Sequence, residues 1–235
     1  TADEETGMSG SLILNEKGYT NEAELLIIAE PTNLNIGIAE KGLLWAILKV
    51  YGKSAHGSMP SEGKNAIEAV LDVIPQLYKC LEPKQNKVLG HSTLNIGKIS
   101  GGTKINIVPD YVELEVDYRL IPEQDHEIVI NKLNNIKSES CKVEVEIIKR
   151  HPSLQSDLNH QFIQNLKKIS KMKCIGLSYA TDAVNFVDQH NPIPFVIFGP
   201  GNPNIVHKID EWISLEQVFQ ATEFITKTLL KTYTL

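Results

Sequence analysis

The sequence has few cysteines, no long apolar run and no excess of basic residues. Its three cysteines, Cys80, Cys141 and Cys174, lie far apart and form no C-x-x-C pair, which favours free thiols in a reducing compartment and so a cytoplasmic protein. Lys and Arg number 23 against 29 Asp and Glu, a net charge of −6, so we expect no nucleic-acid partner. Since no apolar segment is long enough to cross a bilayer, we expect no membrane partner.

Short, continuous apolar runs mark the first and last parts of the chain. LLIIA at 25–29 and PFVIFG at 194–199 are typical of strands that are buried on both faces, as in a parallel sheet. Helical spacing of apolar residues follows Asp157 and recurs near the C-terminus, at Val218, Ala221, Ile225 and Leu229. Residues 1–42 and 153–235 are therefore predicted to form parts of one α/β domain.

The middle of the chain has a different pattern. In YVELEVDYRL at 111–120, apolar and charged residues alternate, which predicts a strand with one buried and one wet face. Further strands are predicted at 43–52, 92–100 and 142–149. One helix is predicted at 63–82, with Ile67, Val70, Ile74 and Leu77 on one stripe, and another carries Val129, Leu133 and Ile136. The order is βαββαβ, the split pattern of a ferredoxin-like sandwich, inserted as residues 43–152.

Four residues of the flanking segments have the side chains of a metal centre. In TADEETG, the adjacent Glu4 and Glu5 point apart, so one can bind a metal while the other acts as a general base; alternatively they are solvated loop acids. Glu30 and His207 each follow a predicted strand, where ligands gather in open α/β sheets. Glu30 could instead simply face water, and a lone histidine is more often structural.

Three residues of the middle segment are candidates for substrate contacts. His56 lies in the small-residue loop GKSAHGSMP, and could equally be a surface histidine. Asn106 lies in SGGTKINIVPD, either a ligand-binding loop or a plain connection between strands. Arg119 could grip a substrate carboxylate, or pair with an acid across the strands.

Taken in order, these segments resemble the M20 family of co-catalytic zinc aminoacylases and peptidases. The likeness is greatest to its branch of succinyl-diaminopimelate desuccinylases and acetylornithine deacetylases. The matching segments run from residue 1 to about 216: TADEETG, IIAEPTNLNIGIAEKG, GKSAHGSMPSEGKNAIE, GGTKINIVPD with VDYRLIPE, YATDAVNF and GPGNPNIVHKIDEWIS. The resemblance implies a partial α/β catalytic domain of the phosphorylase/hydrolase-like zinc peptidase fold. The inserted ferredoxin-like unit would be its lid and dimerisation domain.

The resemblance also implies a role for each candidate of the metal centre. Glu4 is the general base. Glu5 and His207 ligate one zinc ion, and Glu30 ligates the other. Two zinc ions are therefore expected in the complete protein, with cobalt or manganese as alternatives.

For the substrate site, the resemblance implies residues from both parts of the chain. His56 stabilises the oxyanion from the lid of the partner subunit in a homodimer. Asn106 and Arg119 hold polar groups and the carboxylate of the substrate, and Thr181 and Gly201 lie in loops that flank it. The expected substrate is an N-acyl amino acid or a short peptide.

One departure from the family pattern limits these expectations. The Gly-His-x-Asp motif and the bridging aspartate of the family are missing, since Gly90-His91 is followed by Ser92 and falls inside the lid. The chain is therefore predicted to be part of a longer one and, alone, to be inactive and poor in metal. A non-catalytic dimerisation or binding module is the alternative. An RNA-binding sheet is disfavoured because the inner strands lack paired exposed aromatics and the charge is acidic.

Overall fold

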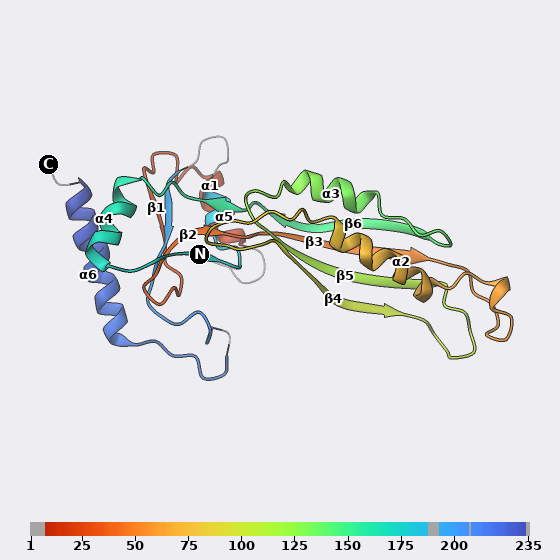
Figure 1. Ribbon diagram of the computed structural model, residues 1–235. Helices are drawn as coiled ribbons and strands as arrows, with labels where there is room; N and C mark the ends of the chain where they lie inside the picture. Colours follow the sequence, from red (N-terminus) through yellow and green to blue (C-terminus); the bar gives the residue numbers. More distant parts are fainter. Residues whose placement is uncertain (1–7, 188–192, 207, 234–235) are drawn as a thin grey trace. The chain divides into compact units, whose positions relative to one another are not determined.

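The computed structural model describes residues 8–187, 193–206 and 208–233 (Figure 1). The chain divides into two compact units. One, here called the split unit, comprises residues 1–41 and 153–235, and the other, the inserted unit, comprises Gly42–Pro152.

The inserted unit is an α+β sandwich with one antiparallel sheet. Its elements follow in the order β3 (Gly42–Tyr51), a 3₁₀ turn (Pro60–Glu62), α2 (Ala66–Lys79), β4 (Thr93–Gly101), β5 (Tyr111–Leu120), α3 (His126–Asn134) and β6 (Lys142–His151). The four strands are arranged β4-β5-β3-β6, and every neighbouring pair is antiparallel. This βαββαβ unit confirms the ferredoxin-like fold predicted from the sequence.

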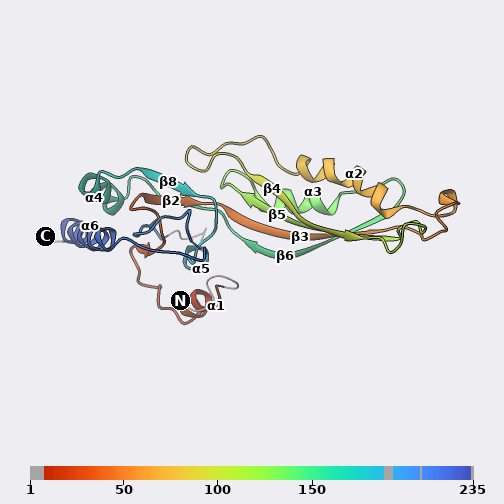
Figure 2. The ribbon, with the colours of Figure 1, turned by 90° about the horizontal axis from the view of Figure 1, so that it is seen from below.

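Helices α2 and α3 cover one face of this sheet (Figures 1 and 2). Along β5, every second residue from Val112 to Leu120 is buried, and the charged residues between them are half-buried on the other face. Tyr118 is fully buried and donates a hydrogen bond of 2.8 Å to the carbonyl oxygen of Leu77 on α2. Burial raises the pKa of Tyr118, so its hydroxyl stays a donor at any physiological pH.

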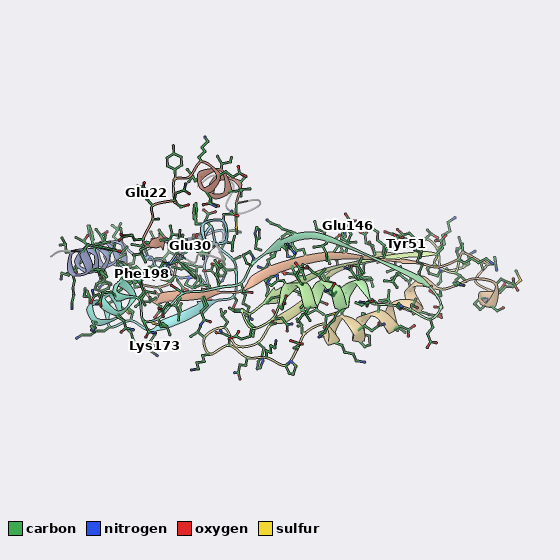
Figure 3. The ribbon with its side chains drawn as sticks, turned by 90° about the horizontal axis from the view of Figure 1, so that it is seen from above. Glu22, Glu30, Tyr51, Glu146, Lys173 and Phe198 are labelled. Atoms are coloured by element: carbon green, nitrogen blue, oxygen red, sulfur yellow. The ribbon has the colours of Figure 1, made fainter. Side chains whose placement is uncertain are left out.

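The other face of the sheet is open and carries balanced charge. Lys49 and Glu146 pair across β3 and β6 at 2.7 Å, and the rings of Tyr51 and Tyr111 lie opposite each other on β3 and β5, 5.4 Å apart. Figure 3 labels Tyr51 and Glu146 on the side away from the two helices. Both tyrosines are more than one-third exposed, so the prediction that the inner strands carry no paired exposed aromatics is wrong. The surrounding acids match the lysines, which gives no basic surface for RNA.

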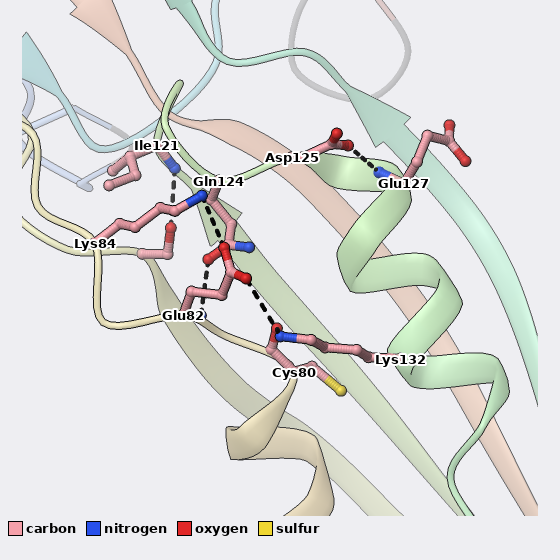
Figure 4. Close-up of polar contacts among 9 residues, drawn as sticks. Cys80, Glu82, Lys84, Ile121, Gln124, Asp125, Glu127 and Lys132 are labelled. Carbon is pink, nitrogen blue, oxygen red and sulfur yellow. Dashed lines mark hydrogen bonds and ion pairs between the residues drawn. The ribbon is translucent and has the colours of Figure 1, made fainter.

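Side-chain caps and one polar cluster hold the ends of the two helices. Asp125 caps α3 by accepting from the amide of Glu127 at 2.8 Å. Beyond the end of α2, the Gln124 side chain accepts from the amide of Glu82, whose carboxylate pairs with Lys84 at 2.8 Å and reaches toward Lys132 (Figure 4). The ion pair with Lys84 lowers the pKa of Glu82. These contacts tie the α2 end to the loop before α3.

The split unit has a mixed sheet rather than a parallel one. Its elements are α1 (Ser9–Glu16), β1 (Leu26–Ile28), β2 (Ile36–Glu40), β7 (Leu154–Gln155), α4 (Gln161–Ser170), β8 (Cys174–Leu177), α5 (Ala183–Phe186), β9 (Phe195–Ile197) and α6 (Leu215–Tyr233). The strands run β1-β9-β2-β7, and β8 also pairs with β2. β1 is parallel to β9 and β8 to β2, but β2 is antiparallel to β9 and β7.

Two helices expose different faces from those predicted. On α2, Ile67 is 46% exposed, and the buried stripe is Ala66, Ala69, Val70, Val73 and Leu77. On α6, only Ala221 of the four predicted positions is buried and Leu229 is 38% exposed. Thr228 is the other buried residue of α6, because this helix packs on α4 through small and polar side chains, with Asn165 bonded to Thr232 at 3.1 Å.

All three cysteines are free thiols, as predicted. Burial raises the pKa of Cys80, which makes its thiol unreactive. Among the helices of the described residues, none is both long and apolar enough to cross a membrane.

Candidate functional site

The predicted site residues divide between the two units. Glu4, Glu5 and His207 lie outside the described residues. Glu30, Thr181 and Gly201 belong to the split unit, and His56, Asn106 and Arg119 belong to the inserted unit. Each group is therefore described within its own unit.

Glu30 lies at the edge of the sheet where β1 and β9 both end. These strands are parallel and in register from Leu26 opposite Phe195 to Ile28 opposite Ile197, so the segments that follow them leave at the same edge. The backbone of Gly199 approaches that of Glu30 so closely that a Cβ at position 199 would lie 2.6 Å from the Glu30 carbonyl oxygen. The Glu30 side chain is half-buried at this edge.

A set of backbone bonds joins the turn after Glu30 to the loop that leads to position 207. The Asn33 amide donates to the carbonyl of Gly201 at 2.7 Å, and the Thr32 hydroxyl bonds to both the amide and the carbonyl of Gly199 at 3.2 Å. Gly201 has φ +99°, a conformation that favours glycine. Its amide donates to Gln217 at 2.9 Å. Glu30 and Gly201 are thus brought together, as a shared ligand site requires.

Thr181 lies at the other end of β2. Its amide and its hydroxyl both donate to the carboxylate of Glu40, at 3.1 and 2.7 Å, and both residues are fully buried. Glu40 is the last residue of β2, whereas Asn33 and the Gly201 loop meet just before β2 begins; the strand between them has five residues, about 17 Å. The Thr181 hydroxyl is therefore used inside the protein. Lys41, the residue that follows Glu40, is also buried, and this desolvation lowers the pKa of its amine.

His56 and Asn106 lie on two loops that are in direct contact. A short antiparallel bridge pairs His56 with Ile107, and the Gly57 amide donates to the carbonyl of Asn106 at 2.8 Å. Both side chains are exposed. The Nδ1 atom of His56 lies 2.7 Å from the hydroxyl of Ser58 and 3.2 Å from its amide nitrogen. The structure thus brings together two residues that are 50 positions apart in the sequence.

Arg119 is half-buried on the open face of the inserted sheet. Its guanidinium makes two bonds to the carboxylate of Asp117, with Nε and Nη2 at 3.1 and 3.0 Å from Oδ2. The partner is therefore two residues away on the same strand rather than across the sheet. A substrate carboxylate would have to share or displace this aspartate.

Sequence reasoning missed two residues at these places, Glu40 and Ser58. Glu40 is the buried partner of Thr181, and Ser58 is the partner of the His56 ring. Glu40 lies within a strand whose five residues are all buried, and a charged residue in such a strand requires a partner. That was the available signal. For Ser58 no comparable signal exists in the sequence.

Within the described ranges, no group of three or more His, Cys, Asp or Glu side chains could hold a metal ion. Of the predicted ligands, these ranges contain only Glu30.

The two units define an α/β protein with an inserted ferredoxin-like domain, and comparisons with known proteins agree. A family model described as the peptidase dimerisation domain (M20_dimer) matches residues 38–145. A probable succinyl-diaminopimelate desuccinylase of Staphylococcus aureus is 32% identical, over 91% of this chain and 61% of the relative. An acetylornithine deacetylase of Salmonella heidelberg is 28% identical, over 97% of this chain and 62% of the relative. The chain belongs to the M20 family.

Solved structures agree on the fold. Aminopeptidase PepT from Bacillus cereus superposes with a TM-score of 0.75 at 21% identity, covering 96% of this chain and 61% of that one. A tripeptidase from Staphylococcus aureus gives 0.63, also at 21% identity, with the same coverage. The predicted fold class is confirmed. The chain spans about three-fifths of the length of these relatives.

Proposed function

We propose that this chain is the larger part of a metal-dependent amidohydrolase. The single observation that carries the proposal is the convergence of the Glu30 turn and the 199–201 loop at the edge where β1 and β9 end. The names of the relatives support it, since desuccinylase, deacetylase and tripeptidase all denote hydrolysis of an amide bond. The substrate is then an N-acyl amino acid of the N-succinyl-diaminopimelate or N-acetylornithine type, or a short peptide.

The metal centre holds two zinc ions, with cobalt or manganese as alternatives. Glu5 and His207 are the ligands of one ion and Glu30 is a ligand of the other. Carboxylate and imidazole are donors that suit zinc, and the half-buried place of Glu30 at the strand edge fits such a role. When bound, the ions supply a water activated at neutral pH and polarise the scissile carbonyl.

The residues of the chain then move protons and stabilise charge. Glu4 accepts the proton of the attacking water and returns it to the leaving amine. His56, from the inserted unit of the second subunit, donates a hydrogen bond to the developing oxyanion. Asn106 and Arg119 hold polar groups and the carboxylate of the substrate. The Gly201 and Thr181 loops, which lie at opposite ends of β2, flank it from two sides. The exposure of His56 and Asn106 on adjoining loops supports their share of this site.

We further propose that the protein is a cytoplasmic homodimer joined through the inserted unit. The match to a dimerisation domain and the three free cysteines support this. Light scattering on the purified protein tests the dimer, because a monomer at micromolar concentration would contradict it.

The test begins with the intact mass of the protein from its natural source, compared with 26.2 kDa. The natural polypeptide, with the mass found in this way, is then purified. Its zinc content is measured, and its hydrolysis of N-succinyl-diaminopimelate, N-acetylornithine and a tripeptide is assayed. Glu30→Gln removes a proposed metal ligand and is expected to lower zinc content and to abolish hydrolysis. Glu24→Gln, at an exposed acid before β1, is the matched control and should leave both unchanged.

The 235-residue chain by itself is expected to bind little zinc and to be inactive, because three or four ligands are the norm for this ion. Hydrolysis by this chain alone would contradict that expectation. If the natural polypeptide binds zinc and cleaves none of the three substrates, the proposed hydrolase is wrong, and a dimerisation or binding module replaces it.

A further inference from the structure

We propose that Ser58 is a positioning residue that fixes the tautomer of His56. In the neutral ring, Nδ1 is held as an acceptor by Ser58, so the proton resides on Nε2 and is presented outward as a hydrogen-bond donor. The loop that contains His56 therefore prepares this side chain before any ligand arrives.

The backbone amide nitrogen of Ser58 lies 3.2 Å from Nδ1 of His56, with its hydrogen directed at that atom. An amide N–H can only donate, so Nδ1 must accept. A proton on Nδ1 would point at the Ser58 amide hydrogen. The Ser58 hydroxyl, at 2.7 Å, then donates to the same nitrogen. One residue thus supplies two donors to one side of the ring.

The backbone around the ring is fixed by bonds to the neighbouring loop. Gly57 donates to Asn106 at 2.8 Å, Val108 donates to Ala55 at 2.9 Å, and Met59 donates to the carbonyl of His56 at 2.8 Å. The geometry that holds Ser58 next to the ring therefore does not depend on the two side chains alone.

A second histidine provides the opposite case within the same unit. Nδ1 of His91 lies 2.8 Å from the carbonyl oxygen of Lys84. A carbonyl oxygen can only accept, so Nδ1 of His91 must carry the proton. The two exposed histidines of the inserted unit are thus expected to be in different tautomers. In an NMR spectrum, the ring-nitrogen signals of one histidine can therefore be compared with those of the other.

The catalytic consequence rests on the proposed hydrolase function, whereas the tautomer does not. For a histidine that donates to an oxyanion, a proton on Nε2 is productive and a proton on Nδ1 is not, because Nδ1 faces Ser58. Ser58 is accordingly a residue that acts through His56 rather than on the substrate.

The experiment is nitrogen-15 NMR of the ring nitrogens in the full chain at about pH 8, where histidine side chains are neutral. His56→Gln and His91→Gln assign the signals. We expect His56 to carry its proton on Nε2 and His91 on Nδ1. A His56 signal with the proton on Nδ1, or with both forms populated in the unaltered chain, would overturn the inference.

Substitutions at Ser58 separate the effect of this residue on the His56 tautomer from the tautomer that an imidazole ring prefers by itself. Ser58→Ala removes the closer donor and should make the second tautomer of His56 measurable, while Ser58→Thr should restore the single form. Ser61→Ala, at an exposed serine of the same segment, is the matched control and should change nothing. A His56 signal that is identical in Ser58→Ala and the unaltered chain would show that the hydroxyl has no part.

In the natural polypeptide, Ser58→Ala should lower kcat roughly tenfold and leave KM within about twofold. Equal kcat values with a shifted tautomer would remove the catalytic consequence. If the polypeptide hydrolyses no amide, the proposed function fails, and the NMR result still decides the tautomer.

Discussion

Gly57 is the residue that lets the His56 loop meet the Asn106 loop. A Cβ at this position would lie 3.0 to 3.1 Å from three backbone atoms of Asn106, which cannot move as a flexible side chain can. Gly57→Ala should therefore separate the loops, at a cost of about 1–2 kcal/mol in the free energy of unfolding. Hydrogen exchange at residue 57 reports the loss of its bond to Asn106.

Gly97→Ala is the matched control for this change. There the nearest heavy atom is 3.5 Å away, at the Asn95 amide, an ordinary contact. Equal protection at residue 57 in Gly57→Ala and in the unaltered chain would contradict the close approach.

Thr181 is predicted to stabilise the protein through Glu40. Its hydroxyl donates to a fully buried carboxylate, and a hydrogen bond to a charged group is worth about 1.5–3 kcal/mol. Thr181→Val, which keeps the side-chain shape, should lower the free energy of unfolding by that amount in urea titration. Thr181→Ser keeps the hydroxyl and should cost less. If valine and serine have equal effects, the bond contributes nothing to stability.

At the scale of elements, alternation along a strand was the most informative signal. The pattern at 111–120 predicted both the strand and its buried face, and β5 has those bounds and that face. Helix faces were harder to predict, because apolar residues outnumber the buried positions. On α2, small residues such as Ala66 and Ala69 are buried against the sheet, while Ile67 and Leu71 remain exposed.

Contacts between distant elements could not be predicted from the local pattern. Tyr51 meets Tyr111 only because β3 and β5 pair in one particular register. Thr181 and Glu40 are 141 positions apart and meet because β8 lies beside β2. The partner of Arg119 depends on which acid its side chain can reach on the finished sheet. Glu30 and His207 were each predicted to follow a strand. The parallel pairing of β1 and β9 makes the segments after these two strands leave at the same edge, and His207 itself lies outside the described residues.

The N-terminus of α2 provides a prediction at this scale. The side chain of Asn65 accepts from the amides of Ile67 and Glu68 at 3.0 and 3.3 Å and donates to the Glu68 carboxylate at 2.9 Å. Asn65→Ala leaves these amides without their cap and should cost about 1 kcal/mol. Asn65→Ser is the control, since serine also caps helices. Thermal unfolding of the three proteins compares them, and equal midpoints would contradict a role for the cap.

At the scale of the whole molecule, the inserted unit is expected to make stability depend on pH. His126 at the start of α3 and His151 at the end of β6 are partly buried, and desolvation lowers the pKa of both, helped by the charges of Arg150 and Lys149 respectively. The unfolded chain binds these protons first as the pH falls. The free energy of unfolding should therefore be fully retained above about pH 6.5 and decrease as the pH falls below it.

The double variant His126→Gln, His151→Gln tests this prediction. Neutral glutamine cannot take up the protons, so the variant should have a flatter dependence of unfolding free energy between about pH 6.5 and 5 than the unaltered chain. Urea titrations at several pH values measure it, and the difference between the two curves removes the contribution of every other titratable group. Each single variant should account for part of the difference. Parallel curves would mean that neither ring is harder to protonate in the folded protein than in the unfolded one.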